Sequence, residues 1–183
     1  MPCSMCGQAG HNISTCPEES KKAAAAHPIL EIDMGVRDKL QILAGICREV
    51  AGGLKKGRVE GVYQNAVCQE LQERHISYVA EETIPILYKG KFVGIERIDV
   101  CLTSWLDFIF EFKAVASDIR PEHLWQVISY LNQKGYNHGA VVNFNQSVKG
   151  DLQIQFVVKK GGEWFIYDLE TDSGNKLEGY GGV

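Results

Sequence analysis

The sequence lacks an excess of positive charge, a long hydrophobic run and a secretory signal. Lys and Arg number 19 against 23 Asp and Glu, so the formal net charge is −4 and no overall cationic field attracts nucleic acid. No apolar run is long enough to span a bilayer, and the N-terminus lacks the charged-then-apolar order of a signal peptide. We therefore expect an intracellular protein, in the cytoplasm or nucleus, that makes no membrane contact.

The composition is that of a globular protein with one main core. Of the 183 residues, 45% are hydrophobic and 23% are charged, as in ordinary folded domains. Any contact with a polyanion must come from local groups of cations, each of which taken alone is typical of solvated lysines at turns. These groups are Lys55, Lys56 and Arg58; Lys89 and Lys91; and Lys159 and Lys160.

Three of the six cysteines lie in the first 16 residues, together with a histidine, in the spacing C-x2-C-x4-H-x4-C. In a reducing compartment, clustered cysteines indicate a metal site rather than disulfides. Zn²⁺ takes four tetrahedral sulfur and nitrogen ligands, and this spacing supplies four within one short segment. The expected zinc ligands are Cys3, Cys6, His11 and Cys16. The alternative is an unstructured tail that carries cysteines by chance.

The same segment resembles the CCHC zinc knuckle family at all four ligands. Knuckles of that family bind single-stranded nucleic acid, so the resemblance implies a module that tethers nucleic acid. It is also associated with eukaryotic proteins and with viruses that infect eukaryotes. No aromatic residue, Arg or Lys lies between the ligands, and Ile13 is the sizeable apolar side chain there. A protein partner bound through the knuckle is therefore an open alternative.

The rest of the chain divides into a linker over 18–34, one domain over 35–170 and a flexible, glycine-rich tail over 171–183. Hydrophobic periodicity predicts helices from about residue 35 to the glycines at 52–53, over 59–74 and over 121–134. Alternating apolar runs predict six strands: 76–88, 92–102, 106–114, 139–144, 152–158 and 163–169. This order predicts an α/β fold with a mixed β-sheet flanked by helices.

Two neighbouring predicted strands carry acidic residues on one face. Because side chains alternate along a strand, Asp99 points away from the apolar face of its strand, which is formed by Ile98, Val100 and Leu102. Glu111 and Lys113 likewise point away from the apolar face of theirs, which is formed by Leu106, Phe108, Phe110 and Phe112. If the strands form a hairpin, the carboxylates meet, and a divalent cation would offset their repulsion. The alternative is a solvated sheet face whose charges pair across the strands.

The segment "GRVEGVY" at 57–63 resembles the signature of the GxxExxY family. The likeness continues through "ELQERHISY", "YKGKFVG", "RID", "EFKAV", "QVISYL" and "GAVVNF" and spans about residues 36–145. That family is similar to the PD-(D/E)xK nuclease superfamily, whose core is a mixed sheet flanked by helices. The resemblance implies a metal-dependent nuclease that hydrolyses phosphodiester bonds, on a domain to which the knuckle adds a tether.

The resemblance also implies roles for individual residues. Asp99 and Glu111 match the acids that bind Mg²⁺ or Mn²⁺, Glu60 matches an additional helical ligand, and Lys113 matches the lysine that positions or activates water. Gln126 and Tyr130 reproduce the Q-x-x-x-Y feature of the exonuclease-like branch, which contacts the site or the substrate. The substrate would be DNA or RNA, single-stranded or with ends.

The functional alternative is a non-catalytic nucleic-acid-binding protein, used for packaging or as an adaptor, that retains the nuclease fold. Such a protein would bind independently of metal, with an affinity that falls steeply as salt rises. The acidic composition of the chain disfavours this alternative without excluding it.

Overall fold

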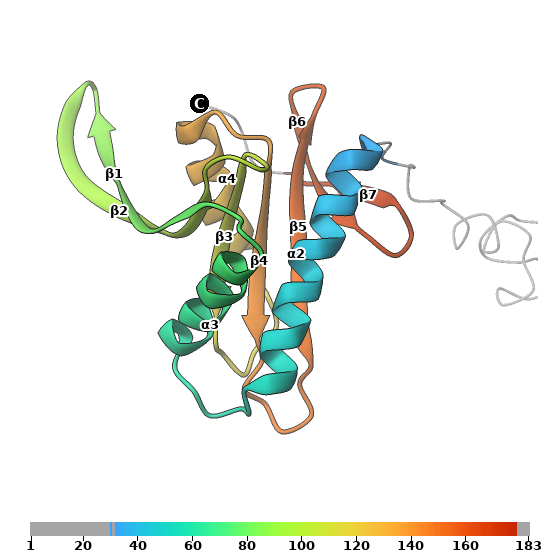
Figure 1. Cartoon of the computed structure of the whole chain (residues 1–183). Helices are drawn as coiled ribbons and strands as arrows, with labels where there is room; N and C mark the ends of the chain where they lie inside the picture. The colour runs from blue at the N-terminus through green and yellow to red at the C-terminus, as the bar shows by residue number, and fades with distance from the viewer. Residues whose placement is uncertain (1–29, 31, 179–183) are drawn as a thin grey trace, which may run out of the picture.

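The computed structural model describes residue 30 and residues 32–178 (Figure 1). The expected zinc knuckle over 1–17 lies outside the described residues, as does most of the expected linker over 18–34. The described helices are α2 (Met34–Gly53), α3 (Glu60–Glu73) and α4 (Pro121–Lys134). The described strands are β1 (Tyr78–Tyr88), β2 (Lys91–Leu102), β3 (Phe108–Lys113), β4 (His138–Phe144), β5 (Leu152–Lys160), β6 (Glu163–Asp168) and β7 (Ser173–Lys176).

The seven described strands form one sheet, in which the spatial order follows the chain order. All neighbouring strands are antiparallel except β3 and β4, which are parallel. Parallel neighbours need a crossover between them, and α4 provides it because it lies between β3 and β4 in the chain. The expected mixed sheet flanked by helices is therefore confirmed. None of the described helices is both long and apolar enough to cross a membrane.

Helices cover both faces of the sheet, α2 and α3 on one and α4 on the other (Figure 1). The strand β3 lies in the interior of the sheet, between β2 and β4, and is buried from both sides. Phe108, Phe110 and Phe112 pack under α2 and α3, whereas Ile109 packs under α4. Each such fully buried side chain contributes about 1.5–3 kcal/mol of transfer free energy. The strand that carries Glu111 and Lys113 is consequently fixed by the core.

The β1–β2 hairpin curves away from the body of the protein (Figure 1). Its strands pair along their whole length, but β2 pairs with β3 only over residues 100–102. The outer part is therefore a two-stranded ribbon with large exposed apolar side chains, among them Leu87, Phe92 and Ile95.

Residues 173–176, which we expected to belong to a flexible tail, form β7 and pair with β6. The turn before β7 is fixed by Asp168, whose Oδ1 accepts hydrogen bonds from the N–H groups of Glu170 and Thr171. Gly174 packs so closely on Leu30 that an added Cβ would lie 2.7 Å from Leu30 Cδ2. Leu30, which we had assigned to the linker, is thus a buried part of the core.

Candidate active site

Asp99 lies in β2 at the point where this strand separates from β3. The ladder between the two strands begins at the pair Val100 and Phe110. Beyond it, Asp99 Oδ2 accepts a hydrogen bond of 2.7 Å from the backbone N–H of Phe112. The Asp99 carboxylate therefore accepts the hydrogen bond that a backbone carbonyl of β2 would accept in a regular ladder. This contact holds Asp99 next to β3, the strand that carries Glu111 and Lys113.

The regular alternation that we predicted for β2 is wrong at this position. Ile98 packs in the α4-side core, whereas Val100 and Leu102 pack on the side of α2 and α3. The neighbouring strand β1, which pairs with β2, is also irregular, because its residue Glu81 has a φ of 59°. A non-glycine residue in the left-handed region is uncommon and marks a local distortion of the strand. The distortion changes which face β2 presents on the two sides of Asp99.

Glu111 is the most buried acid of the site, with 3% of its surface exposed. Its Oε1 lies 2.5 Å from Lys113 Nζ, two residues along the same face of β3. Its other oxygen, Oε2, is buried and has no hydrogen-bond partner among the described residues. Burial raises the pKa of Glu111 to about 7, and the negative charge of Asp99 adds to the rise, while Lys113 opposes it.

Glu60 adds a third carboxylate from the first turn of α3, where the helix dipole favours negative charge. Its pKa is raised by burial, lowered by the charge of Lys113, raised by Asp99 and lowered by the backbone N–H of Ala114. The pKa of Asp99 is likewise raised, mainly by burial, while the Phe112 N–H and Lys113 oppose the rise. Three acids thus interact around one lysine at the end of β3.

Gln146, which sequence reasoning missed, fixes the start of α3 relative to the sheet. Its Oε1 accepts a 2.5 Å hydrogen bond from the N–H of Gly57, and its Nε2 donates to Tyr63 Oη at 3.2 Å. Its backbone N–H donates to the carbonyl of Val115, just after β3, at 3.0 Å. Gly57 has a φ of 89°, a conformation that glycine adopts without strain. One glutamine therefore joins the Gly and Tyr that flank Glu60.

Gln64 is a second residue that the sequence did not indicate. It is buried on α3, and its Nε2 donates to the carbonyl of Asp99 at 3.0 Å and to Glu81 Oε1 at 2.9 Å. A polar residue on the inner side of a predicted helix was the available signal. Its partners lie on other elements, so the sequence did not identify them.

The helix α4 covers the face of the sheet on which Glu111 and Lys113 lie, because these residues alternate with Phe110 and Phe112 along β3. Gln126 Nε2 donates to Tyr130 Oη at 2.8 Å, four residues along the same helix. Burial raises the pKa of Tyr130 to about 12, and the charges of Glu111 and Asp99 contribute to the rise. His123 is also buried, and its pKa is lowered by burial and then by Lys113. The α4 side chains are therefore within electrostatic reach of the acids.

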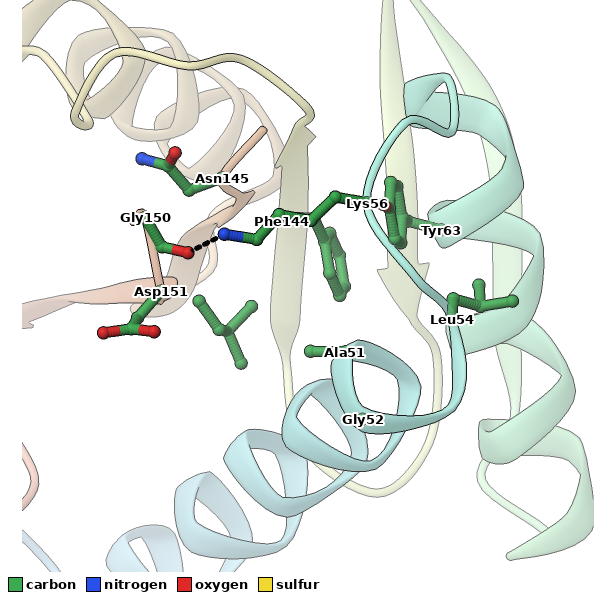
Figure 2. A pocket seen from close by; sticks show the side chains of 10 residues that line it. Ala51, Gly52, Leu54, Lys56, Tyr63, Phe144, Asn145, Gly150 and Asp151 are labelled. Atoms are coloured by element: carbon green, nitrogen blue, oxygen red, sulfur yellow. Dashed lines mark hydrogen bonds between the residues drawn. The ribbon is translucent and has the colours of Figure 1, made fainter. Parts of the chain in front are cut away.

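A cavity of about 300 Å³ lies beside this site, at the C-terminal end of α2 (Figure 2). Tyr63 and Phe144 form part of its wall, with their rings stacked 4.4 Å apart. Lys56 crosses its mouth and donates to the carbonyl of Gly150 (Figure 2). The catalytic residues predicted from the sequence do not line the cavity, so it is a neighbour of the carboxylate site and not the site itself.

The side chains at the end of β3 suit a hard divalent cation in their chemistry, although they do not form a complete cage. Within the described residues, no group of three or more His, Cys, Asp or Glu side chains is arranged to hold a metal ion. Asp99 is turned toward the Phe112 N–H, and Glu111 toward Lys113. The buried Oε2 of Glu111 nevertheless lacks a partner in this part of the chain, and carboxylate oxygens are the ligands that Mg²⁺ and Mn²⁺ prefer.

Comparison with known protein families gives a match over more than half of the chain. A family model described as the PD-(D/E)XK nuclease superfamily matches residues 37–155. This range includes every residue predicted above for the nuclease site: Glu60, Asp99, Glu111, Lys113, Gln126 and Tyr130. No curated protein and no solved structure gives a match.

Proposed function

The chain belongs to the PD-(D/E)XK nuclease superfamily, and on this premise we propose that it is a metal-dependent nuclease that hydrolyses phosphodiester bonds. The observation that carries the proposal is the environment of the two carboxylate oxygens of Glu111. One of its oxygens pairs with Lys113, and the other is buried beside the charge of Asp99 without a partner in the described part of the chain. A buried acid with an unsatisfied oxygen is costly for stability, and such groups are typical of functional sites.

In this proposal Asp99, Glu111 and Glu60 hold a Mg²⁺ or Mn²⁺ ion. When bound, the ion would polarise a phosphoryl oxygen and lower the pKa of its bound water. It would also offset the effect of burial, which is the main cause of the raised pKa values of these acids, and the negative charge of Asp99, which adds to the rise at Glu60 and Glu111.

Lys113 supplies a fixed positive charge beside the carboxylates. Its Nζ contacts Glu111, so β3 and the Glu111 carboxylate together restrict where the ammonium lies. A preorganised charge of this kind stabilises the negative oxygens of a phosphoryl group as the reaction proceeds. Tyr130 accepts from Gln126, and with a pKa of about 12 it keeps its proton at neutral pH. The hydroxyl therefore keeps a proton that it can donate to a group at the site.

We further propose that Cys3, Cys6, His11 and Cys16 bind one Zn²⁺ and that this knuckle tethers nucleic acid. The support is the ligand spacing and the resemblance to CCHC knuckles. A weak binding module joined by a linker raises the effective concentration of substrate at the nuclease site.

Cleavage assays on the purified chain test the nuclease proposal. End-labelled single-stranded DNA, duplex DNA and RNA are incubated with Mg²⁺ or Mn²⁺, and with EDTA as a metal-free control. We expect cleavage that needs metal and that falls by at least about 100-fold in Glu111→Gln, which removes a proposed metal ligand, and in Lys113→Ala, which removes the positive charge beside the reacting phosphate.

Lys91→Ala is the matched control, because Lys91 is an exposed lysine at the tip of the β1–β2 hairpin; it should cleave as the wild type does. Circular dichroism checks that every variant is folded. If the wild type leaves all three substrates intact with both metals, the nuclease proposal is wrong. Binding without cleavage would instead support the non-catalytic alternative.

A further inference from the structure

Two loops lie side by side next to the carboxylate site: residues 54–59, between α2 and α3, and residues 145–151, between β4 and β5. We call them the linked loops, because hydrogen bonds join them. Lys56 Nζ donates to the carbonyl of Ser147 at 2.7 Å and also to that of Gly150 (Figure 2). The loops therefore form one surface of defined shape.

Positive charge is concentrated on the linked loops. They contain four basic residues, Lys55, Lys56, Arg58 and Lys149, and one acidic residue, Asp151. Their formal charge is therefore 4 − 1 = +3, in a chain whose formal net charge is −4. A local positive region on an acidic protein directs polyanions to that region and not to the rest of the surface.

Three of these cations have no acidic partner among the described residues. Lys55, Arg58 and Lys149 are exposed, and none of their side chains makes an ion pair or hydrogen bond within the described part of the chain. Seven other described cations form ion pairs: Arg37, Arg74, Arg97, Lys113, Arg120, Lys134 and Lys176. The charges of the linked loops are thus available to an external anion.

The linked loops also lie directly beside the acids. Arg58 precedes Glu60 by two residues, and Glu60 interacts with Lys113 and with the N–H of Ala114. On the other loop, the N–H of Gln146 donates a hydrogen bond to the carbonyl of Val115, the residue after Ala114. The N-terminus of α3, which begins at Glu60, also lies at this site, and the helix dipole adds to the positive field there.

Resting on the nuclease function proposed above, we propose that the linked loops bind the phosphates of the nucleic-acid strand and lead it to the carboxylate site. Lys55, Arg58 and Lys149 contact successive phosphates of the backbone. Contacts of this kind position a strand without reading its sequence. Lys56 has a structural role instead, because its ammonium group holds the two loops together.

The proposal predicts a specific salt dependence. Each phosphate neutralised by the protein contributes about 0.7 to the slope of log K against log salt for a single strand and about 0.9 for a duplex. Removal of three phosphate-binding cations should therefore reduce the slope on single-stranded DNA by about 2, which corresponds to about 100-fold weaker binding near 0.1 M salt.

The test compares two triple variants that remove the same charge. The first, Lys55→Gln/Arg58→Gln/Lys149→Gln, removes the exposed cations of the linked loops. The control is Arg48→Gln/Lys89→Gln/Lys91→Gln, on exposed residues of α2 and the hairpin tip. Binding of labelled single-stranded DNA is measured by fluorescence anisotropy without added Mg²⁺ or Mn²⁺ and without a chelator, from about 50 to about 300 mM salt, and cleavage is measured in Mn²⁺. The full chain is used throughout.

We expect the slope of the first variant to be smaller by about 2 units. Its KM should rise at least about 10-fold with kcat changed less than about 3-fold, because the substitutions act on binding and not on the acids. The control should keep the wild-type slope and KM. Equal changes in both variants, or no change in the first, overturn the proposal while the nuclease function stands. A wild type that neither binds nor cleaves overturns both.

Discussion

Replacing Glu111 by Gln should stabilise the folded protein at neutral and alkaline pH while it removes nuclease activity. The folded pKa of Glu111 is about 7, against an ordinary value of 4.5, so the folded state binds the proton more tightly than the unfolded chain does. Stability is therefore highest below about pH 4.5 for this group and falls as the pH rises toward about 7, because over this range the unfolded chain loses the proton while the buried carboxyl keeps it. Gln mimics the protonated acid at every pH.

The size of the effect follows from the difference between the two pKa values. At about 1.4 kcal/mol per unit, the raised pKa of Glu111 lowers the free energy of unfolding, relative to a side chain that does not ionise, by about 3 kcal/mol near pH 8 and by about 1 kcal/mol near pH 5. The pKa of about 7 already includes the favourable charge of Lys113. The advantage of Glu111→Gln should therefore grow by about 2 kcal/mol between these two pH values.

Urea denaturation followed by tryptophan fluorescence measures this difference, because the chain has three tryptophans and the transition midpoint reports stability at constant m. EDTA keeps both proteins metal-free. Glu73→Gln, at an exposed position on α3, is the matched control and should differ from the wild type by the same amount at both pH values. If the curves of Glu111→Gln and the wild type stay parallel from pH 5 to pH 8, the reasoning from burial is refuted.

Three further predictions test the fold, the start of α3 and the knuckle. Gly139→Ala should lower the free energy of unfolding by about 1–3 kcal/mol, since its Cβ would lie 2.8 Å from Val127 Cγ1, whereas Gly45→Ala, which meets no neighbour within 4 Å, should raise it by up to about 1 kcal/mol; thermal melts distinguish the two. Gln146→Ala should raise the Mn²⁺ concentration for half-maximal cleavage, because Glu60 is no longer held in place; an unchanged Mn²⁺ requirement would contradict this role. Native mass spectrometry should find one Zn²⁺ per chain and none in Cys3→Ser, and metal retained in that variant would exclude the proposed ligand.

Local pattern was sufficient for most of the secondary structure. Pro121 begins α4 and Lys134 ends it, as the sequence indicated, because proline is favoured in the first turn and the apolar stripe has helical spacing. The strands that carry the acids were likewise found from alternation, and their antiparallel pairing is as expected.

Alternation was not sufficient where the backbone is irregular. It predicted one face for Ile98 and Val100, and they lie on opposite faces. At this irregular point of β2, the Asp99 carboxylate accepts a hydrogen bond from Phe112 in the neighbouring strand, and no periodicity within β2 encodes that contact. β7 was missed for a related reason, because four polar and glycine residues become a strand through the edge that β6 offers.

The sequence by itself determined which chemical groups the protein has and on which elements they lie. Glu111 and Lys113 share a face because a strand repeats every two residues, and Glu60 begins a helix because periodicity starts there. Only the tertiary structure decided the environment of those groups. The burial of Glu111, the bridge from Gln146 to Gly57 and Tyr63, and the joining of the two basic loops all depend on residues far apart in the chain. Burial and hydrogen bonding are properties of neighbours in space, and packing of the core brings those neighbours together.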